Sequence, residues 1–292
     1  MLGAVRISGV RVAAFLTFAL MIASQAGAVQ ILLASGDASL SGLNYSKDDV
    51  VSFDTETETA SVYFTGADHF AASNEDIDAL QLLDNGNLLL STKGDASLGG
   101  ISFDKADVVE YDPVAESASI IFSGDSVFTS ASENIDALHL RSNGNLIFST
   151  AADAKIGSLS ITKKDLVEYD PVAETATILF DGTLTSGSNR DINAFQLLAD
   201  GTYVLSTAGN ASLGGASWSK DDLVQYDPVS GSAHVFFEGA NYFASAGENV
   251  EAAFVVGGAL EEKGPVVPEP STGALVALGI ALLSRVERRH DA

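Results

Sequence analysis

The chain of 292 residues carries 15 Lys and Arg against 39 Asp and Glu, which gives a formal net charge of −24. This charge excludes a protein that binds nucleic-acid phosphates through a basic surface. The absence of Cys excludes disulfides, thiolate metal sites and a Cys nucleophile. A hydrophobic fraction of 46% is enough to build a folded core.

Residues 1–28 have the pattern of a secretory signal peptide. Arg6 and Arg11 precede an apolar run over residues 12–22, and the small residues Ala26-Gly27-Ala28 follow it. The alternative is a retained membrane anchor, but the apolar run is short for a hydrocarbon core of ~30 Å. We therefore predict a hydrophobic targeting helix that is cleaved after Ala28.

The middle of the chain repeats itself four times with a period of 57 or 58 residues. The related segments VSFD, VEYD, VEYD and VQYD end at Asp54, Asp112, Asp170 and Asp227. Each complete copy contains four short apolar runs bounded by turn residues, such as Asp84-Asn85-Gly86 between the first two runs of the second copy. Short runs rich in Val, Ile, Leu and Phe indicate four antiparallel strands per copy.

The ends of the repeat region are circularly shifted. The first copy begins at residues 29–33, which match a second strand, and the missing first strand reappears at residues 250–256. An open β-solenoid would explain the period but not this shift. We therefore predict an all-β, four-bladed β-propeller whose first blade is closed by the C-terminal strand. The predicted blades cover residues 29–76 plus 250–256, 77–134, 135–191 and 192–249.

In a propeller blade, the connections 2→3 and 4→1 open on one face, and here both are long. We expect function on this long-loop face. Four oxygen-bearing side chains open the innermost strands on that face: Asp78, Asp136, Asn193 and Glu251. A ring of hard oxygen ligands suits Ca²⁺ or another hard cation, and the sequence indicates no other cofactor. The alternative is that these side chains only bond nearby backbone N–H groups.

A second acidic set occupies both ends of each 2→3 loop. It pairs Asp37, Asp95, Asp153 and Asn210 with Asp49, Asp107, Asp165 and Asp222, twelve residues later. One interpretation is a Ca²⁺ ion in each loop. A repeated lysine stands two positions before each second Asp: Lys47, Lys105, Lys163 and Lys220. This lysine favours Asx turns with a structural ion pair between each Lys and that Asp.

Two positions before each repeated lysine stands a large apolar side chain. The four are Tyr45, Phe103, Ile161 and Trp218. Exposed rings there would stack on sugars, but Ile161 has no ring. We therefore expect buried loop anchors.

Beyond a linker at residues 257–267, the chain ends in three parts. These are Pro268-Glu269-Pro270, an apolar stretch over residues 272–284, and the basic residues Arg285, Arg288 and Arg289. This tail resembles the PEP-CTERM sorting signal of Gram-negative bacteria, although Glu287 and Asp291 depart from its basic cluster. The resemblance implies that residues 268–292 include a transmembrane helix and are recognised and removed by an exosortase, a membrane protease-transpeptidase. The arginines would stay on the cytoplasmic side.

These features predict an exported, non-catalytic binding or structural module, first an inner-membrane intermediate and then part of the cell surface or extracellular matrix. Its expected partners are signal peptidase and the exosortase during export, the membrane before processing, and extracellular polysaccharide or surface proteins afterwards. The four His residues show no ligand or triad spacing. The alternative is a carbohydrate-active enzyme that uses carboxylates on the long-loop face.

Overall fold

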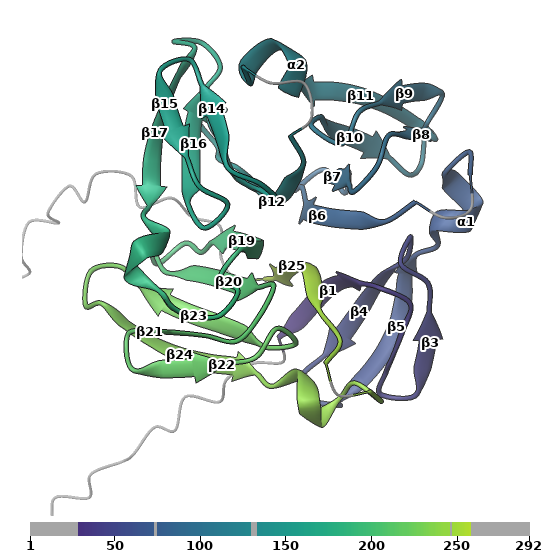
Figure 1. Ribbon diagram of the computed structural model, residues 1–292. Coiled ribbons are helices and arrows are strands. Elements are labelled where there is room, and N and C mark those ends of the chain that lie inside the picture. Colours follow the sequence, from purple (N-terminus) through teal and green to yellow (C-terminus); the bar gives the residue numbers. More distant parts are fainter. Residues whose placement is uncertain (1–28, 73–74, 130–132, 246, 258–292) are drawn as a thin grey trace, which may run out of the picture.

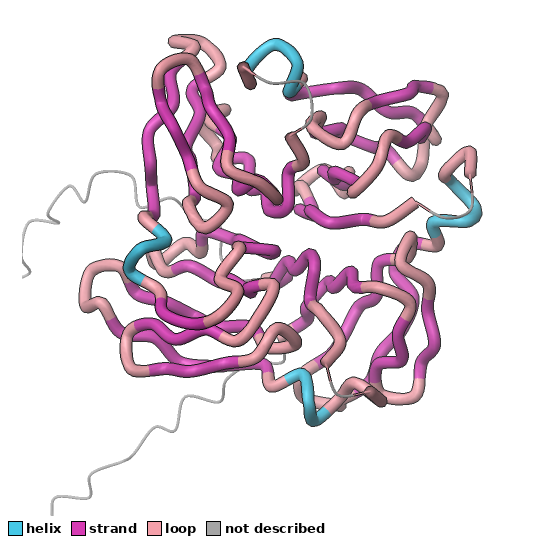
Figure 2. The backbone as a smooth tube through the Cα atoms, in the orientation of Figure 1, coloured by secondary structure: helices cyan, strands magenta, loops and turns pink. Residues whose placement is uncertain are grey.

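The computed structural model describes residues 29–72, 75–129, 133–245 and 247–257. The two predicted targeting segments, 1–28 and 268–292, and most of the linker lie outside these residues. The described chain is all-β (Figures 1 and 2). Its helices are single turns near the periphery: α1 (Gly66–His69), α2 (Gly124–Val127), η1 (Gly182–Leu184) and η2 (Gly239–Asn241). None of the helices in these ranges is long and apolar enough to cross a membrane.

Sixteen strands form four separate antiparallel sheets of four strands each. The first sheet has the order β25 (Val250–Val256), β1 (Gln30–Ser35), β4 (Val50–Asp54), β5 (Thr59–Phe64). The second has β6 (Ile77–Leu82), β7 (Leu88–Thr92), β10 (Val108–Asp112), β11 (Ser117–Phe122). The third has β12 (Ile135–Leu140), β13 (Leu146–Thr150), β16 (Leu166–Asp170), β17 (Thr175–Phe180). The fourth has β19 (Ile192–Leu197), β20 (Tyr203–Thr207), β23 (Leu223–Asp227), β24 (Ser232–Phe237).

The long 2→3 loops fold into small hairpins, which the sequence analysis did not predict. They are β2 (Ala38–Leu40) with β3 (Leu43–Tyr45), β8 (Ala96–Leu98) with β9 (Ile101–Phe103), β14 (Ala154–Ile156) with β15 (Leu159–Ile161), and β21 (Ala211–Leu213) with β22 (Ala216–Trp218). The two-residue strand β18 (Ser186–Gly187) also pairs with β21. The second strand of each hairpin contacts the outermost strand of its own sheet. At one such contact, a Cβ on Gly99 would lie 2.4 Å from the backbone nitrogen of Ala118, so only glycine fits.

The four sheets lie around a common centre, with β6, β12, β19 and β25 innermost (Figure 1). Alternate side chains of each strand point to opposite faces of its sheet, so each sheet packs against both neighbours. Leu89 joins the buried cluster shared with Phe148 of the third sheet, whereas Leu90 joins the cluster shared with Leu32 of the first. Two further clusters fill the spaces between the third and fourth sheets and between the fourth and first.

The predicted pairing of residues 29–33 with the strand at residues 250–256 is confirmed. In the antiparallel pair β1–β25, Gln30 lies opposite Val256 and Leu32 opposite Phe254. Backbone hydrogen bonds also join each sheet to the next around the whole set. The nitrogen that opens each innermost strand donates to the carbonyl of a repeated lysine: Ile77 to Lys47, Ile135 to Lys105, Ile192 to Lys163, and Val250 to Lys220.

Candidate functional site

The repeated carboxylates at the end of each 2→3 loop are structural. Asp49 is buried, and its Oδ2 accepts from the backbone nitrogen of Ser46 at 2.9 Å while its Oδ1 accepts from that of Gly66 at 3.0 Å. Asp107, Asp165 and Asp222 make the same pair of backbone bonds in their own repeats. A Cβ on Gly66 would lie 2.1 Å from the carbonyl oxygen of Asp48, so glycine is required at this close approach. Both oxygens of these carboxylates are therefore used by backbone groups, one in the same loop and one just after the outermost strand of the same sheet.

At the other end of the loop, neither the predicted Asx turns nor the predicted ion pairs are found among the described residues, and Asp37 and Asp153 instead bond the backbone of the lysine ten residues later. Asp37 Oδ1 accepts from the backbone nitrogen of Lys47 at 3.0 Å, and Asp153 Oδ1 from that of Lys163 at 3.2 Å. Within the part of the chain that the structure describes, no ion pair joins a repeated lysine to the Asp two positions later. Lys47 Nζ lies 3.9 Å from Asp76, and Lys163 Nζ lies 2.8 Å from Asp191.

The repeated lysines do not pair within their own loops because backbone hydrogen bonds hold them against the neighbouring sheet. Each repeated lysine carbonyl is bonded to the first residue of the next innermost strand, and Asp76 and Asp191 directly precede Ile77 and Ile192. The lysine side chain therefore reaches the neighbouring sheet. The Asp of its own loop is already occupied by backbone N–H groups.

The four residues predicted to ring the central mouth do come together. Asp78, Asp136, Asn193 and Glu251 all line one cavity of about 390 Å³. The remaining lining residues are Lys93, Lys105, Asn134, Ala151 and Asn249. We call this space the central cavity. It lies where β6, β12, β19 and β25 begin, at the end of the sheets that carries the long loops.

Two sets of polar contacts divide the central cavity. On one side, Asn134 Nδ2 donates to Asp78 Oδ2 at 2.7 Å and to Asp136 Oδ1 at 3.0 Å. On the other, Lys93 Nζ lies 2.5 Å from Glu251 Oε1 and 3.3 Å from Asp76 Oδ2. Lys93 was missed by the sequence analysis. The sequence offered one indication of its role: the chain has few basic residues, and Lys93 is one that stands outside the repeated lysine positions.

Several buried oxygen atoms in and beside the central cavity have no hydrogen-bond donor among the described residues. They are Asp76 Oδ1, Asp78 Oδ1, Asn134 Oδ1, Asn249 Oδ1 and Glu251 Oε2. Asp78 is 2% exposed and Glu251 7%. All five atoms are acceptors. A buried acceptor without a donor costs on the order of 1–3 kcal/mol, so the cavity favours a ligand that supplies N–H or O–H groups.

Burial also shifts the acid–base properties of these carboxyl groups. Desolvation, assisted by the charge of Asp136, raises the pKa of Asp78 well above its usual range. Desolvation raises the pKa of Asp136 to about 7, against the opposing effect of Lys93. Desolvation likewise raises the pKa of Glu251, although the hydrogen bond from Lys93 opposes it. Asp136 therefore exchanges a proton near neutral pH, and burial favours the protonated form of Asp78.

The geometry for a metal ion is weak. Within the residues that the structure describes, no group of three or more His, Cys, Asp or Glu side chains is placed to hold a metal. Glu251 is moreover engaged by Lys93. The calcium prediction therefore depends only on the oxygen chemistry of the ring.

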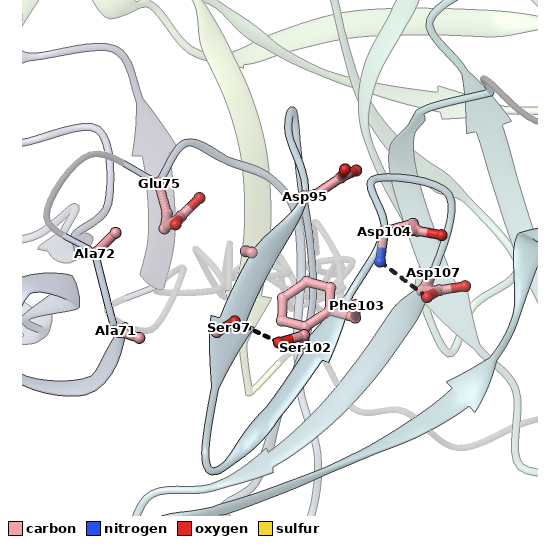
Figure 3. Close-up of a pocket in the computed structure, with 10 residues that line it drawn as sticks. Ala71, Ala72, Glu75, Asp95, Ser97, Ser102, Phe103, Asp104 and Asp107 are labelled. Carbon is pink, nitrogen blue, oxygen red and sulfur yellow. Dashed lines mark hydrogen bonds between the residues drawn. The ribbon is translucent and has the colours of Figure 1, made fainter.

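A second cavity, of about 490 Å³, lies beside the hairpin β8–β9 (Figure 3). It brings Glu75 near Asp95 and Asp104, and the repulsion of Asp95 raises the pKa of Asp104. Asp107, which the calcium-per-loop interpretation needs, is taken by backbone bonds, including one from Asp104 at 3.0 Å. Phe103 is buried in this hairpin, and Tyr45, Ile161 and Trp218 are buried at the same position of the other repeats, as predicted.

A third cavity, of about 790 Å³, lies at the opposite end of the sheets. The tight turns after β6, β12 and β19 line it, and its wall includes Leu83, Leu140, Leu198 and Arg141. Arg141 is held by both carboxylate oxygens of Glu168 at 3.1 Å.

No protein-family model and no curated protein sequence matches the chain. Solved structures that resemble it do so at low identity. One is the nidogen/laminin complex, with a TM-score of 0.38, 8% identity, and coverage of 78% of this chain and 98% of that one. Another is a protein of unknown function from Bacteroides caccae, with a TM-score of 0.32, 8% identity, and coverage of 72% of both chains. A third is the extracellular domain of a proposed one-component system from B. thetaiotaomicron, with a TM-score of 0.31 and 11% identity. Here the match covers 70% of this chain but only 34% of the other.

Proposed function

We propose that residues 29–256 form a four-bladed β-propeller with the blade boundaries given by the repeats. Three observations support this. Four sheets of equal strand number share four buried clusters, one between each pair of neighbours. The pair β1–β25 completes the first sheet from both chain ends. The bond from Val250 to the carbonyl of Lys220 joins the last sheet to the first.

The propeller is exported and then anchored or released at the surface of a Gram-negative bacterium. The support is in the sequence: a signal peptide at 1–28, a linker at 257–267, and a tail at 268–292 that resembles an exosortase substrate. Removal of residues 1–28 and 268–292 leaves 10 basic and 36 acidic residues, a net charge near −26. Such a charge keeps the body away from anionic lipid.

The propeller acts as a non-catalytic binding or structural module, and the central cavity is its ligand site. The observation that carries this proposal is the set of buried acceptor atoms without donors on residues in and beside the central cavity, on the long-loop side. Groups of this kind cost stability in the free protein, and a ligand with hydrogen-bond donors would recover that cost.

The second candidate is a carbohydrate-active enzyme. It is favoured by the raised pKa of Asp78 and of Asp136 in one cavity, since such an enzyme needs one carboxyl group as acid and another as base or nucleophile. Incubation with extracellular polysaccharide separates the binding module from the enzyme, because only the enzyme cleaves the polymer. The full chain in detergent is incubated with matrix polysaccharide, and bound protein and new reducing ends are both measured. Retention without new reducing ends is expected. New reducing ends would favour the enzyme. If the protein is not retained and no reducing ends appear, both candidates are contradicted.

Ca²⁺ is the remaining candidate ligand, with Asp78, Asp136 and Asn193 as oxygen donors. In that case the unfolding midpoint rises with the logarithm of free Ca²⁺, and Asp78→Asn with Asp136→Asn removes this dependence. A midpoint that is the same in millimolar Ca²⁺ and in EDTA would exclude calcium from this cavity.

A further inference from the structure

We propose that the central cavity recognises an amino sugar, whose protonated amino group lies between Asp78 and Asp136 and whose hydroxyl groups bond the neighbouring acceptors. This assignment rests on the proposed binding function and names its ligand class.

The acidic groups on one side of the central cavity pair with a lysine, and those on the other side do not. Lys93 provides a cation for Glu251 and Asp76. No Lys, Arg or His side chain among the described residues lies within 4.0 Å of Asp78 or Asp136, and the only donor they share is the amide of Asn134. A ligand cation is therefore favoured on the Asp78–Asp136 side.

The described carboxylates also form no cluster of three or more that is placed to hold a metal. The acceptors belong to residues at the ends of different sheets, in and beside a cavity of about 390 Å³. A small ring with one ammonium group and several hydroxyl groups presents donors in several directions at once. Its volume also suits a cavity at the small end of the usual range for small-molecule sites.

Charge strengthens the bond to the amino group relative to a hydroxyl group. Hydrogen bonds between an ammonium group and a carboxylate are roughly twice as strong as neutral ones, and more so away from water. Asp78 lines the cavity and its Oδ1 is buried without a donor. Because burial raises the pKa of Asp78, an ammonium group forms such a bond with it by displacing its proton.

Binding of an amino sugar at this site should release a proton from the protein, and this release can be measured. The pKa of Asp136 is raised to about 7 by burial, so part of the Asp136 population is protonated at pH 6.5. The other charged groups that act on it are Lys93, Lys163, Asp191 and Glu251. An ammonium group placed beside Asp136 favours its ionised form, so the protein should release protons when the ligand binds.

The test is isothermal titration calorimetry of the full chain in detergent at pH 6.5. The ligands are glucosamine, N-acetylglucosamine and glucose, each in two buffers that differ in ionisation enthalpy. Glucosamine should bind at least tenfold more tightly than the two neutral sugars, and its binding heat should change with the buffer in the direction of proton release. Asp136→Asn should abolish the release and weaken glucosamine at least tenfold. Asp125→Asn, which removes an exposed charge outside the cavity, should change neither.

Each result bears on one proposal. Equal affinity for the three sugars, or no proton release on glucosamine binding, would overturn the amino-sugar assignment and leave a neutral-sugar module in place. No binding of any of the three sugars, with polysaccharide still retained, would also overturn it while the binding function stands. The wild-type comparison decides the matter even if Asp136→Asn, checked by circular dichroism, fails to fold.

Discussion

Replacement of Phe254 by alanine tests whether the C-terminal strand is an integral part of the fold. Phe254 is 3% exposed, pairs with Leu32 across β1–β25, and packs in the cluster between the first and second sheets. Truncation of a buried Phe to Ala costs about 3–5 kcal/mol. For a body of this size, that corresponds to a fall in the midpoint of roughly 6–20 °C.

The single Trp of the chain makes this a test of cooperativity. Trp218 is buried in the cluster between the third and fourth sheets, where its Nε1 donates to Thr207 Oγ1 at 2.9 Å. Its fluorescence therefore reports on a region that does not share a cluster with Phe254. In Phe254→Ala, the fluorescence and circular-dichroism transitions should both move down together. Val62→Ala on the outer strand β5, where Val62 is 42% exposed, is the matched control and should shift either transition by much less.

Unchanged Trp218 fluorescence in Phe254→Ala, within a degree or two of the wild-type midpoint, would refute this reasoning. It would mean that β25 frays without affecting the distant sheets. The four sheets would then be stable without the pairing of the chain ends.

Three further outcomes follow from the site and the loops. Because the folded-state pKa of Asp136 is raised from 3.8 to about 7, the unfolded chain loses this proton first, so its contribution to stability falls as pH rises from about 4 to 7. Asp136→Asn should flatten that fall in thermal midpoints measured across this range, and an identical profile would contradict the raised pKa. Asp107→Ala leaves two backbone N–H groups without acceptors and should cost about 2–5 kcal/mol in urea unfolding, whereas Asp125→Ala should cost little. In the membrane-bound precursor, a thiol at Ser97 on the long-loop side should react with a bulky reagent well before one at Asn85 in a tight turn, and the reverse order would contradict the proposed orientation.

Periodicity explains what could be predicted from the sequence. The spacing of the repeats places Asp78, Asp136 and Glu251 at one position of successive innermost strands, and strands that begin at one level around a centre bring such residues together. Residues 29–33 likewise match the second strand of the other repeats. They therefore need a first strand beside them, and residues 250–256 match that strand. Both inferences depend on local patterns that repeat, and both depend little on side-chain rotamers.

The unpredicted features depend on contacts between different sheets. Lys47 lies two residues from Asp49 in the chain, yet its ammonium group reaches Asp76, because its carbonyl binds the start of the next sheet. Lys93 has no counterpart among the repeated lysines, so periodicity could not reveal that it neutralises Glu251. The hairpins within the 2→3 loops were hidden because strands of three residues are too short to show an alternating pattern.

A crystal structure of the exported protein grown with glucosamine tests the central claim most directly, because it reveals both the closure of the sheets and the occupant of the central cavity. The account predicts β25 paired with β1, and the sugar amino group within hydrogen-bond distance of Asp78 and Asp136. A chain end detached from β1, or a sugar bound only outside the cavity lined by Asn193 and Glu251, would contradict it.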